Sequence, residues 1–238
     1  MMTLHESTSL DLGVVDNLLP TSRRAQVEDT LREAIVRGQI PPGTQLKQDE
    51  ISSQLRSSPG PVREALRQLV SEGIVVHYPN RGAFVADISA SELVEVIFPT
   101  RLLAEAYAIT RLTRPINDTL RSALLQSIDE MDAGAARDNL ATVIEADIRF
   151  HEIVMQQSAP PQIMQLWRSV LSRIRMQLYR LGPLHATLSE VADEHRTLLF
   201  VLENGSVDEI RADLNSHIID ASSRLLAHVE NPSIEILH

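Results

Sequence analysis

Apolar residues recur every three or four positions along most of this chain, which is the period of an amphipathic helix. In the N-terminal third, the helices predicted by this pattern are bounded by Gly38, Pro59 and Gly73. Ser22 and Ser58 stand where they can cap the first and third of them. These three predicted helices cover 22–37, 48–55 and 59–72.

A different pattern follows the third predicted helix. The short apolar segments 74–78 and 83–86 flank the turn Pro79-Asn80-Arg81-Gly82, and they predict a small β-hairpin. Three helices followed by a hairpin form the outline of a winged helix-turn-helix.

From Ser89 onward the period is helical throughout. Pro99 is expected to kink the first helix of this region, and Gly134 is expected to separate the second from the third. The predicted helices are 90–113, 116–133, 137–157, 161–181, 185–203 and 206–229. This part of the chain is therefore expected to be an all-α bundle.

The fold class predicted from these patterns is mainly α, with an N-terminal winged helix-turn-helix and a C-terminal helical bundle. The expected organisation is a polar arm over 1–20, the winged domain over 21–88, the bundle over 89–230 and a tail over 231–238.

Composition narrows the function classes. The chain has 238 residues and no cysteine, which excludes disulfides, thiolate metal sites and cysteine nucleophiles. Its net charge is −10, but residues 21–90 hold nine Lys/Arg against eight Asp/Glu, so the winged domain is nearly neutral and the rest is acidic. No secretory signal or membrane-spanning run is recognisable, so we expect a cytoplasmic protein with no membrane partner.

Basic residues mark the third predicted helix and the hairpin. Arg63 and Arg67 are four positions apart and share a face, and Arg81 stands beside Gly82 at the hairpin tip. A helix that reads the major groove of DNA carries basic residues on the face opposite its apolar one. Surface arginines are also ordinary on a small amphipathic helix, so the pattern alone leaves both interpretations open.

The same segments resemble the DNA-binding domain of GntR-family bacterial transcription factors. The matching pieces are "LREAIVRGQIPPGTQL", "PVREALRQLVSEGIV" and "PNRGAFV". The resemblance implies that Arg63 and Arg67 contact double-stranded operator DNA, with Arg81 and Gly82 in the wing. A palindromic operator requires two recognition helices related by a two-fold axis, so a homodimer is expected.

The start of the recognition helix departs from that family. The family usually has Val-Ser-Arg-Thr before its Pro-Val-Arg, whereas Ser57-Ser58-Pro59-Gly60 stands here. Ser58 and Pro59 suit a helix start, and Ser58 remains a candidate DNA contact. The base-reading guanidinium that the family often places in this segment is missing.

Four polar side chains of the bundle lie on otherwise apolar helical stripes: Asp147, His151, His195 and His217. Burying such groups is costly unless they find partners, so three helices that each bring them to one core suggest that they meet. Taken singly, each has an ordinary explanation, an i,i+4 ion pair or a hydrogen-bonded core histidine. Taken together, three imidazoles and a carboxylate suit a divalent transition metal such as Zn²⁺, Ni²⁺, Mn²⁺ or Fe²⁺.

Residues 90–229 resemble the FCD effector domain of the FadR subgroup of GntR regulators, through "DIRFH", "EHRTLL" and "HI". The resemblance implies that Asp147, His151, His195 and His217 bind the metal and that a small carboxylate or hydroxy-acid effector completes its coordination. Arg101 lies in a segment that resembles the family's Arg-x-x-x-Glu. Its guanidinium is predicted either to pair with the effector's carboxylate or to form an i,i+4 ion pair with Glu105.

The leading hypothesis is a metabolite-responsive transcriptional regulator, with no enzymatic activity, that a carboxylate releases from DNA. A metal-dependent hydrolase is the alternative from another class, because a metal with an open position can activate water. A regulator whose metal is purely structural is the third hypothesis.

Overall fold

The computed structural model of the chain describes residues 22–182 and 187–220. The predicted arm 1–20 and tail 231–238 lie outside the described residues. The same holds for the beginning of the predicted helix 185–203 and the end of the predicted helix 206–229.

The N-terminal domain is built on three helices, α1 (Arg23–Val36), α2 (Gln48–Gln54) and α3 (Pro59–Ser71). Ser22 caps α1 as predicted, because its side chain accepts a hydrogen bond from the backbone N–H of Ala25 at 3.3 Å. The apolar stripes of α1 and α3 are buried against each other, including Leu31 and Leu69.

A three-stranded antiparallel sheet completes this domain, with β3 (Gly82–Val85) between β1 (Gln45–Leu46) and β2 (Val75–Tyr78). The predicted hairpin is therefore present, and β1 is an addition that the sequence analysis did not predict. A strand of two residues is too short to show the alternation of apolar and polar positions by which a strand is recognised. The winged helix-turn-helix is confirmed.

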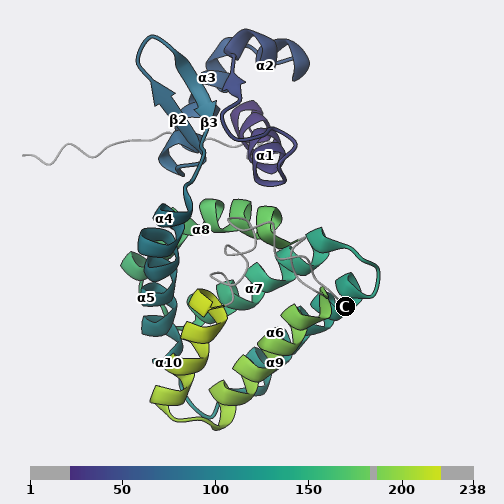
Figure 1. The fold of residues 1–238 in the computed structure, drawn as a ribbon, viewed down its shortest axis with the longest axis vertical. Helices are drawn as coiled ribbons and strands as arrows, with labels where there is room; N and C mark the ends of the chain where they lie inside the picture. Colours follow the sequence, from purple (N-terminus) through teal and green to yellow (C-terminus); the bar gives the residue numbers. More distant parts are fainter. Residues whose placement is uncertain (1–21, 183–186, 221–238) are drawn as a thin grey trace, which may run out of the picture.

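The C-terminal part is all-α, as predicted (Figure 1). Among the described residues, none of the helices is long and apolar enough to cross a bilayer. Its helical segments are α4 (Ala90–Glu92), the π-helical η1 (Leu93–Ile97), α5 (Phe98–Ile109), α6 (Asp118–Ala135), α7 (Leu140–Ser158), α8 (Pro161–Leu181), α9 (Ser189–Asn204), α10 (Val207–Asn215) and the π-helical η3 (Ser216–Asp220).

The predicted helix 90–113 was wrong in its end, whereas the helix is distorted at Pro99, where a kink was predicted. It ends at Ile109, and a π-helical segment interrupts it just before Pro99, with the N–H of Phe98 bonded to the Leu93 carbonyl. Proline has no N–H to donate and its ring crowds the carbonyl four residues earlier, so the backbone widens there.

Gly134 was predicted to be a break, but it lies inside α6. A Cβ placed on it would stand 2.9 Å from Val143 Cγ2, so the absence of a side chain lets α6 and α7 approach closely. The helix ends one residue later, at Ala135, and Asn139 caps α7 by accepting from the N–H of Thr142.

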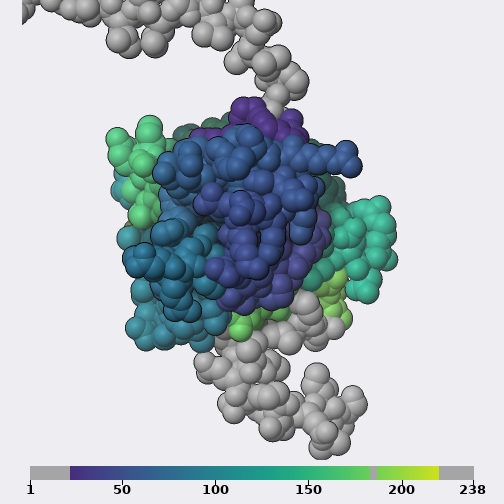
Figure 2. Space-filling model, turned by 90° about the horizontal axis from the view of Figure 1, so that it is seen from above, coloured from purple at the N-terminus to yellow at the C-terminus, as the bar shows by residue number. Residues whose placement is uncertain are grey.

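The two parts of the molecule meet through α8. Its Arg175 donates to Glu33 of α1 at 3.1 Å and its Ser172 donates to Glu72 at 2.8 Å. In Figure 1 α2, α3 and the β-hairpin lie at the end of the molecule far from α6, α9 and α10. Seen from that end, the N-terminal domain covers the centre of the molecule (Figure 2). Its outer face is therefore accessible to a large ligand such as DNA.

Candidate metal centre and nucleic-acid interface

Asp147, His151, His195 and His217 come together in the bundle, as predicted from their apolar stripes. Asp147 and His151 lie one turn apart on α7, His195 lies on α9 and His217 lies on η3. One ligand atom from each of the four lies within 4.8 Å of the others. His195 is fully buried, and His151 and Asp147 are 3% and 6% exposed.

The spacing of the ligand atoms fits one transition-metal ion. His195 Nε2 lies 2.9 Å from Asp147 Oδ1 and 3.3 Å from His151 Nε2, which lies 3.1 Å from His217 Nε2. Two atoms that each lie about 2.0–2.1 Å from one ion, at 90° or at the tetrahedral angle, stand about 2.8–3.4 Å apart. These three distances have the spacing of ligands in a His₃Asp site, whereas His151 Nε2 and Asp147 Oδ1 lie farther apart, at 3.7 Å.

The outer nitrogens of the three imidazoles each face an acceptor. His195 Nδ1 donates to the Val191 carbonyl at 2.7 Å, and His151 Nδ1 lies 2.8 Å from Glu105 Oε2. His217 Nδ1 lies 3.5 Å from Glu194 Oε2. The hydrogen bond of His195 holds its proton on Nδ1 and directs the lone pair of Nε2 at the centre, and the carboxylates beside His151 and His217 favour the same tautomer. Lone pairs and a carboxylate oxygen that converge in a buried space are a donor set that could hold a cation.

The electrostatics suit metal binding at Asp147 and His217, whereas His151 must lose a proton to coordinate a metal. Burial alone would lower the pKa of His151, but Glu105 and Asp147 outweigh burial and raise that pKa. Burial lowers the pKa of His217 to about 4, with His195 adding to the effect, so this imidazole is neutral. Burial alone would raise the pKa of Asp147, but its contacts with His151 and His195 outweigh burial and hold that pKa well below the usual range. Neutral imidazole and ionised carboxylate are the forms that coordinate metal.

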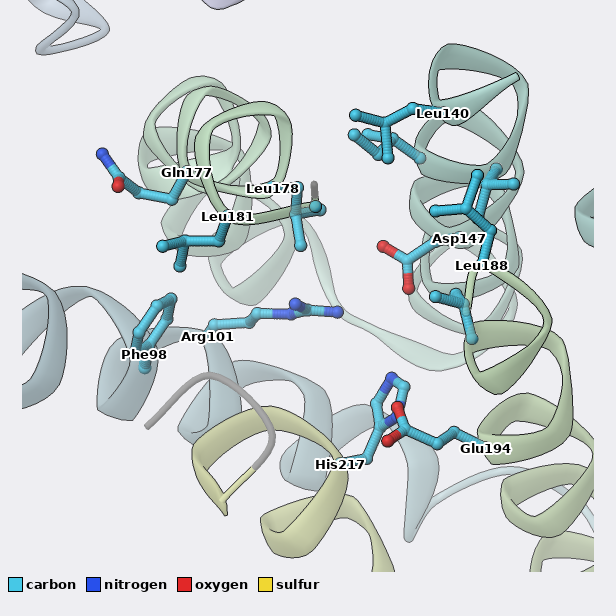
Figure 3. Close-up of a pocket in the computed structure, with 14 residues that line it drawn as sticks. Phe98, Arg101, Leu140, Asp147, Gln177, Leu178, Leu181, Leu188, Glu194 and His217 are labelled. Carbon is cyan, nitrogen blue, oxygen red and sulfur yellow. The ribbon is translucent and has the colours of Figure 1, made fainter. Parts of the chain in front are cut away.

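A cavity of about 60 Å³ opens beside the cluster, and Asp147, His217 and Arg101 line it. Figure 3 shows the Arg101 guanidinium and the Asp147 carboxylate pointing toward each other across this space, with His217 beside Glu194 below them. Asp147 Oδ2 is buried and has no hydrogen-bond partner within the described ranges. The cluster is therefore accessible to a small ligand from the cavity.

Arg101 also forms the ion pair that was the alternative prediction. Its Nε donates to Glu105 Oε1 at 2.8 Å, and both residues are buried. Burial alone would lower the pKa of Arg101, but the charges of Glu105 and Asp147 outweigh it and raise that pKa. The ion pair with Glu105 is therefore present, and the outer end of the guanidinium is directed into the cavity (Figure 3), so pairing with an effector carboxylate stays a prediction.

The sequence analysis did not find the residues that orient the histidines. Glu105 contacts His151 and Arg101 and also accepts from the indole N–H of Trp167 at 2.7 Å. Burial would raise its pKa, but Arg101 and His151 together hold that pKa far below its usual value. A signal was present, since Glu105 shares the face of α5 that carries Ala104 and Ala108, and a charged group on such a face needs buried partners.

Arg63 and Arg67 lie on the outer face of α3. Their side chains are 54% and 67% exposed, and both line a wide groove together with Lys47, His77 and Gly82. Arg67 donates to Glu64 at 2.8 Å, an exposed pair that a phosphate can replace at little cost. This groove between α3 and the wing is the candidate nucleic-acid interface, and Lys47 and His77 are additions to the predicted set.

The wing holds Arg81 at its tip. Asn80 and Gly82 have φ angles of 61° and 90°, in the left-handed region that favours glycine, and they make the tight turn between β2 and β3. The Arg81 guanidinium lies over the rings of Tyr78 and Phe84, at 5.5 and 5.6 Å from their centroids. Arg81 is exposed, so it can reach a ligand that contacts the wing.

Ser58 differs in one respect from what was predicted. It occupies the N-cap position of α3 with extended backbone angles, but its side chain accepts no capping hydrogen bond. Pro59 at the first helical position and Pro61 in the first turn have no N–H, which leaves few donors for the serine hydroxyl to satisfy. The exposed hydroxyl of Ser58 is therefore free to contact another molecule.

A winged helix-turn-helix whose outer groove exposes Arg63 and Arg67, joined to an all-α bundle, is the architecture of a two-domain DNA-binding protein. Residues 23–85 match the bacterial regulatory proteins of the gntR family, and residues 96–220 match the FCD domain. The chain belongs to the GntR family and carries an FCD domain. Its family consists of DNA-binding transcriptional regulators rather than enzymes, which sets the hydrolase alternative aside.

Two relatives are named as transcriptional repressors. The chain is 25% identical over 201 residues to a probable D-xylose utilization operon transcriptional repressor of Paenarthrobacter nicotinovorans, covering 84% of this chain and 88% of the relative. It is 25% identical over 211 residues to the gluconate operon transcriptional repressor of Bacillus licheniformis, covering 86% and 85%.

Solved structures show the same architecture. A GntR transcriptional regulator from Rhodococcus sp. RHA1 superposes with a TM-score of 0.74 at 26% identity, covering 87% of this chain and 99% of that one. The Escherichia coli protein McbR/YncC superposes with a TM-score of 0.70 at 21% identity, covering 88% and 100%, and that likeness concerns the fold alone.

Proposed function

We propose that the protein is a transcriptional repressor that binds a divalent transition metal at Asp147, His151, His195 and His217 and leaves its operator when a small carboxylate binds beside the metal. The observation that carries this proposal is the His₃Asp cluster, which opens onto a cavity containing the Arg101 guanidinium. The relatives named as operon repressors support the direction of regulation.

The metal, when bound, supplies a Lewis-acid position at which a carboxylate or hydroxyl oxygen of the effector can bind. Four protein ligands leave room for such oxygens on a metal that prefers five or six. Arg101 neutralises the charge of the incoming anion in an otherwise acidic domain. A purely structural metal would need no opening through which a ligand could reach it. Two of the four cluster residues, Asp147 and His217, line the cavity, which supports ligand access to the metal.

The bound operator requires two copies of this chain. Recognition helices of a symmetric operator are related by a two-fold axis, so we infer a homodimer. Val96 and Leu103, on η1 and α5, are 53% and 67% exposed and offer apolar surface for such an association.

The α8 helix links the cavity to the DNA-binding domain. Its Leu178 and Leu181 line the cavity, while Arg175 lies between Glu145 of α7 and Glu33 of α1, at 2.5 and 3.1 Å. A ligand that displaces α8 therefore acts on α1 directly. This contact supports a route by which effector binding changes the position of the recognition helices.

Glu105→Gln is expected to weaken metal binding by about 10–100-fold, because the amide no longer supplies the carboxylate that holds the Nδ1 proton of His151. Metal affinity is measured by competition with a chelator of known affinity. Glu152→Gln is the matched control, since Glu152 follows His151 directly but contacts Gln156. Equal metal affinities for a folded Glu105→Gln and the control would contradict the role given to Glu105.

Effector binding is expected to weaken operator binding, and operator binding is expected to weaken effector binding. By linkage, an acid that weakens operator affinity tenfold binds the DNA-bound protein tenfold more weakly than the free protein, about 1.4 kcal/mol. Small carboxylates and 2-hydroxy acids are titrated into the metal-loaded protein, with and without operator DNA, by calorimetry. Equal affinity in both states would remove the regulatory role of the cavity.

The same titration tests Arg101. Arg101→Lys retains the charge but loses the planar pair of donors that matches a carboxylate, so acid affinity should fall about tenfold or more. Arg111→Lys is the control, because Arg111 lies on the ring of Tyr107 at 3.7 Å and does not line the cavity.

A further inference from the structure

The wall of the cavity is divided by polarity. The charged residues Arg101, Asp147 and Glu194 and the imidazole of His217 lie on one side, with Phe98 beside Arg101 and Leu188 beside Asp147 (Figure 3). Opposite them, α8 and the first turn of α7 provide aliphatic side chains. These are Leu140, Val143, Leu178 and Leu181.

The aliphatic part of the wall offers few hydrogen bonds. Gln177 of α8 also lines the cavity, and its buried amide has no hydrogen-bond partner among the described residues, but it points away from the space between Asp147 and Arg101 (Figure 3). A hydroxyl placed against Leu140 or Leu181 would therefore lose its water partners without gaining protein ones. Each such hydroxyl costs roughly tenfold or more in affinity.

The charges of the lining favour a single carboxylate. Arg101 is the one Lys or Arg among the lining residues that the structure describes, while Asp147 and Glu194 are acidic. One carboxylate is satisfied by Arg101 and the metal. A second carboxylate would face aliphatic side chains or like charges, and both arrangements are unfavourable.

The size of the cavity limits the ligand further. A water-sized group needs about 10–15 Å³, so a cavity of about 60 Å³ has room for roughly four to six such groups. That is roughly the size of an acid with three or four carbons.

We propose that the effector is a short aliphatic monocarboxylic or 2-hydroxy acid whose alkyl end packs on Leu140, Leu178 and Leu181. This inference rests on the proposed function and narrows it. A sugar acid with several hydroxyls and a dicarboxylate are both poor ligands for this cavity, although relatives of the chain are named for a gluconate operon.

Three four-carbon acids test the inference, because they share a carboxylate and a 2-hydroxyl and differ only in the tail. They are 2-hydroxybutanoate, threonate and malate, which end in an alkyl group, a diol and a second carboxylate. In calorimetric titrations of the zinc-loaded full-length protein, 2-hydroxybutanoate is expected to bind at least tenfold more tightly than the other two. Threonate or malate binding equally well or better would overturn the inference.

A substitution at Leu178 tests whether the ligand tail contacts the aliphatic wall. Leu178→Asn places an amide of similar size in the aliphatic wall, so the preference for 2-hydroxybutanoate over threonate should shrink by about tenfold. Leu166→Asn is the matched control, since Leu166 is on the same helix, 38% exposed and outside the cavity lining. An unchanged preference in a folded Leu178→Asn variant would count against contact between this wall and the ligand tail.

The outcomes separate this inference from the function on which it rests. If threonate or malate binds best and also weakens operator binding, the protein is a carboxylate-responsive repressor and only the proposed tail is wrong. If none of the three acids binds while zinc binding is retained, the carboxylate-responsive function fails, and the inference fails with it.

Discussion

Replacing Arg63, Arg67 and Arg81 together by alanine is expected to weaken operator binding by more than a hundredfold. The three guanidinium groups lie on the exposed face of α3 and at the tip of the wing. Each lost base contact costs roughly 1–3 kcal/mol, so even the lower value summed over three residues exceeds a hundredfold. Fluorescence titration on a symmetric operator fragment obtained by binding-site selection measures the change.

The salt dependence of operator affinity in the same titration separates contacts to phosphates from contacts to bases. Each lost phosphate contact should lower the slope of log affinity against log salt by about one. The control is a triple alanine variant at Arg121, Arg149 and Arg196, which removes the same charge from half-exposed, acid-paired positions in the bundle. If this control loses as much operator affinity as the first variant, total charge rather than the groove governs binding.

The winged domain could be predicted because its signals are local. Helical periods, the cap at Ser22 and the turn at Asn80-Arg81-Gly82 each involve residues close in sequence. Strand β1 could not be predicted in the same way, since Gln45 and Leu46 become a strand only by pairing with Phe84 and Ala83. Two residues are too few to show the alternation of apolar and polar positions that is typical of a strand.

The convergence of Asp147, His151, His195 and His217 could also be predicted from the pattern of apolar and polar positions. Each is a polar residue on an apolar stripe, and the cost of burying it implies a partner on another helix. The geometry was not predictable, because His217 lies on the π-helical turn η3, and no local pattern indicated a π turn there. Such turns insert an extra residue and change the direction of the side chains that follow.

The outer contacts of the histidines needed the three-dimensional structure. Glu105 is far from His151 in sequence, and it was considered only as the i,i+4 partner of Arg101. In the structure one carboxylate serves His151, Arg101 and Trp167 at once. Sequence reasoning counts pairs within one helix, whereas a buried charge collects partners from every helix that packs around it.

Removing the metal is expected to lower the midpoint of thermal unfolding by about 8–16 °C. A ligand present at about a thousand times its dissociation constant stabilises the native state by roughly 4 kcal/mol. For a chain of this size, each kcal/mol corresponds to about 2–4 °C. The physical cause is the buried cluster, in which three imidazoles and the Asp147 carboxylate converge. Calorimetry of the zinc-loaded protein, before and after treatment with a chelator, measures the shift.

The double variant His195→Ala, His217→Ala shows whether the shift comes from this cluster. Truncating His195, which packs 4.9 Å from the ring of Phe150, also costs core packing, so a lower midpoint alone proves nothing. The informative quantity is the change in the unfolding midpoint when the chelator is added. In the double variant this change should disappear, and elemental analysis should no longer find one zinc per chain. His77→Ala, a change in the wing, should keep both. A double variant that retains one zinc per chain and the full chelator response would place the metal elsewhere, because two of the four ligands would be gone.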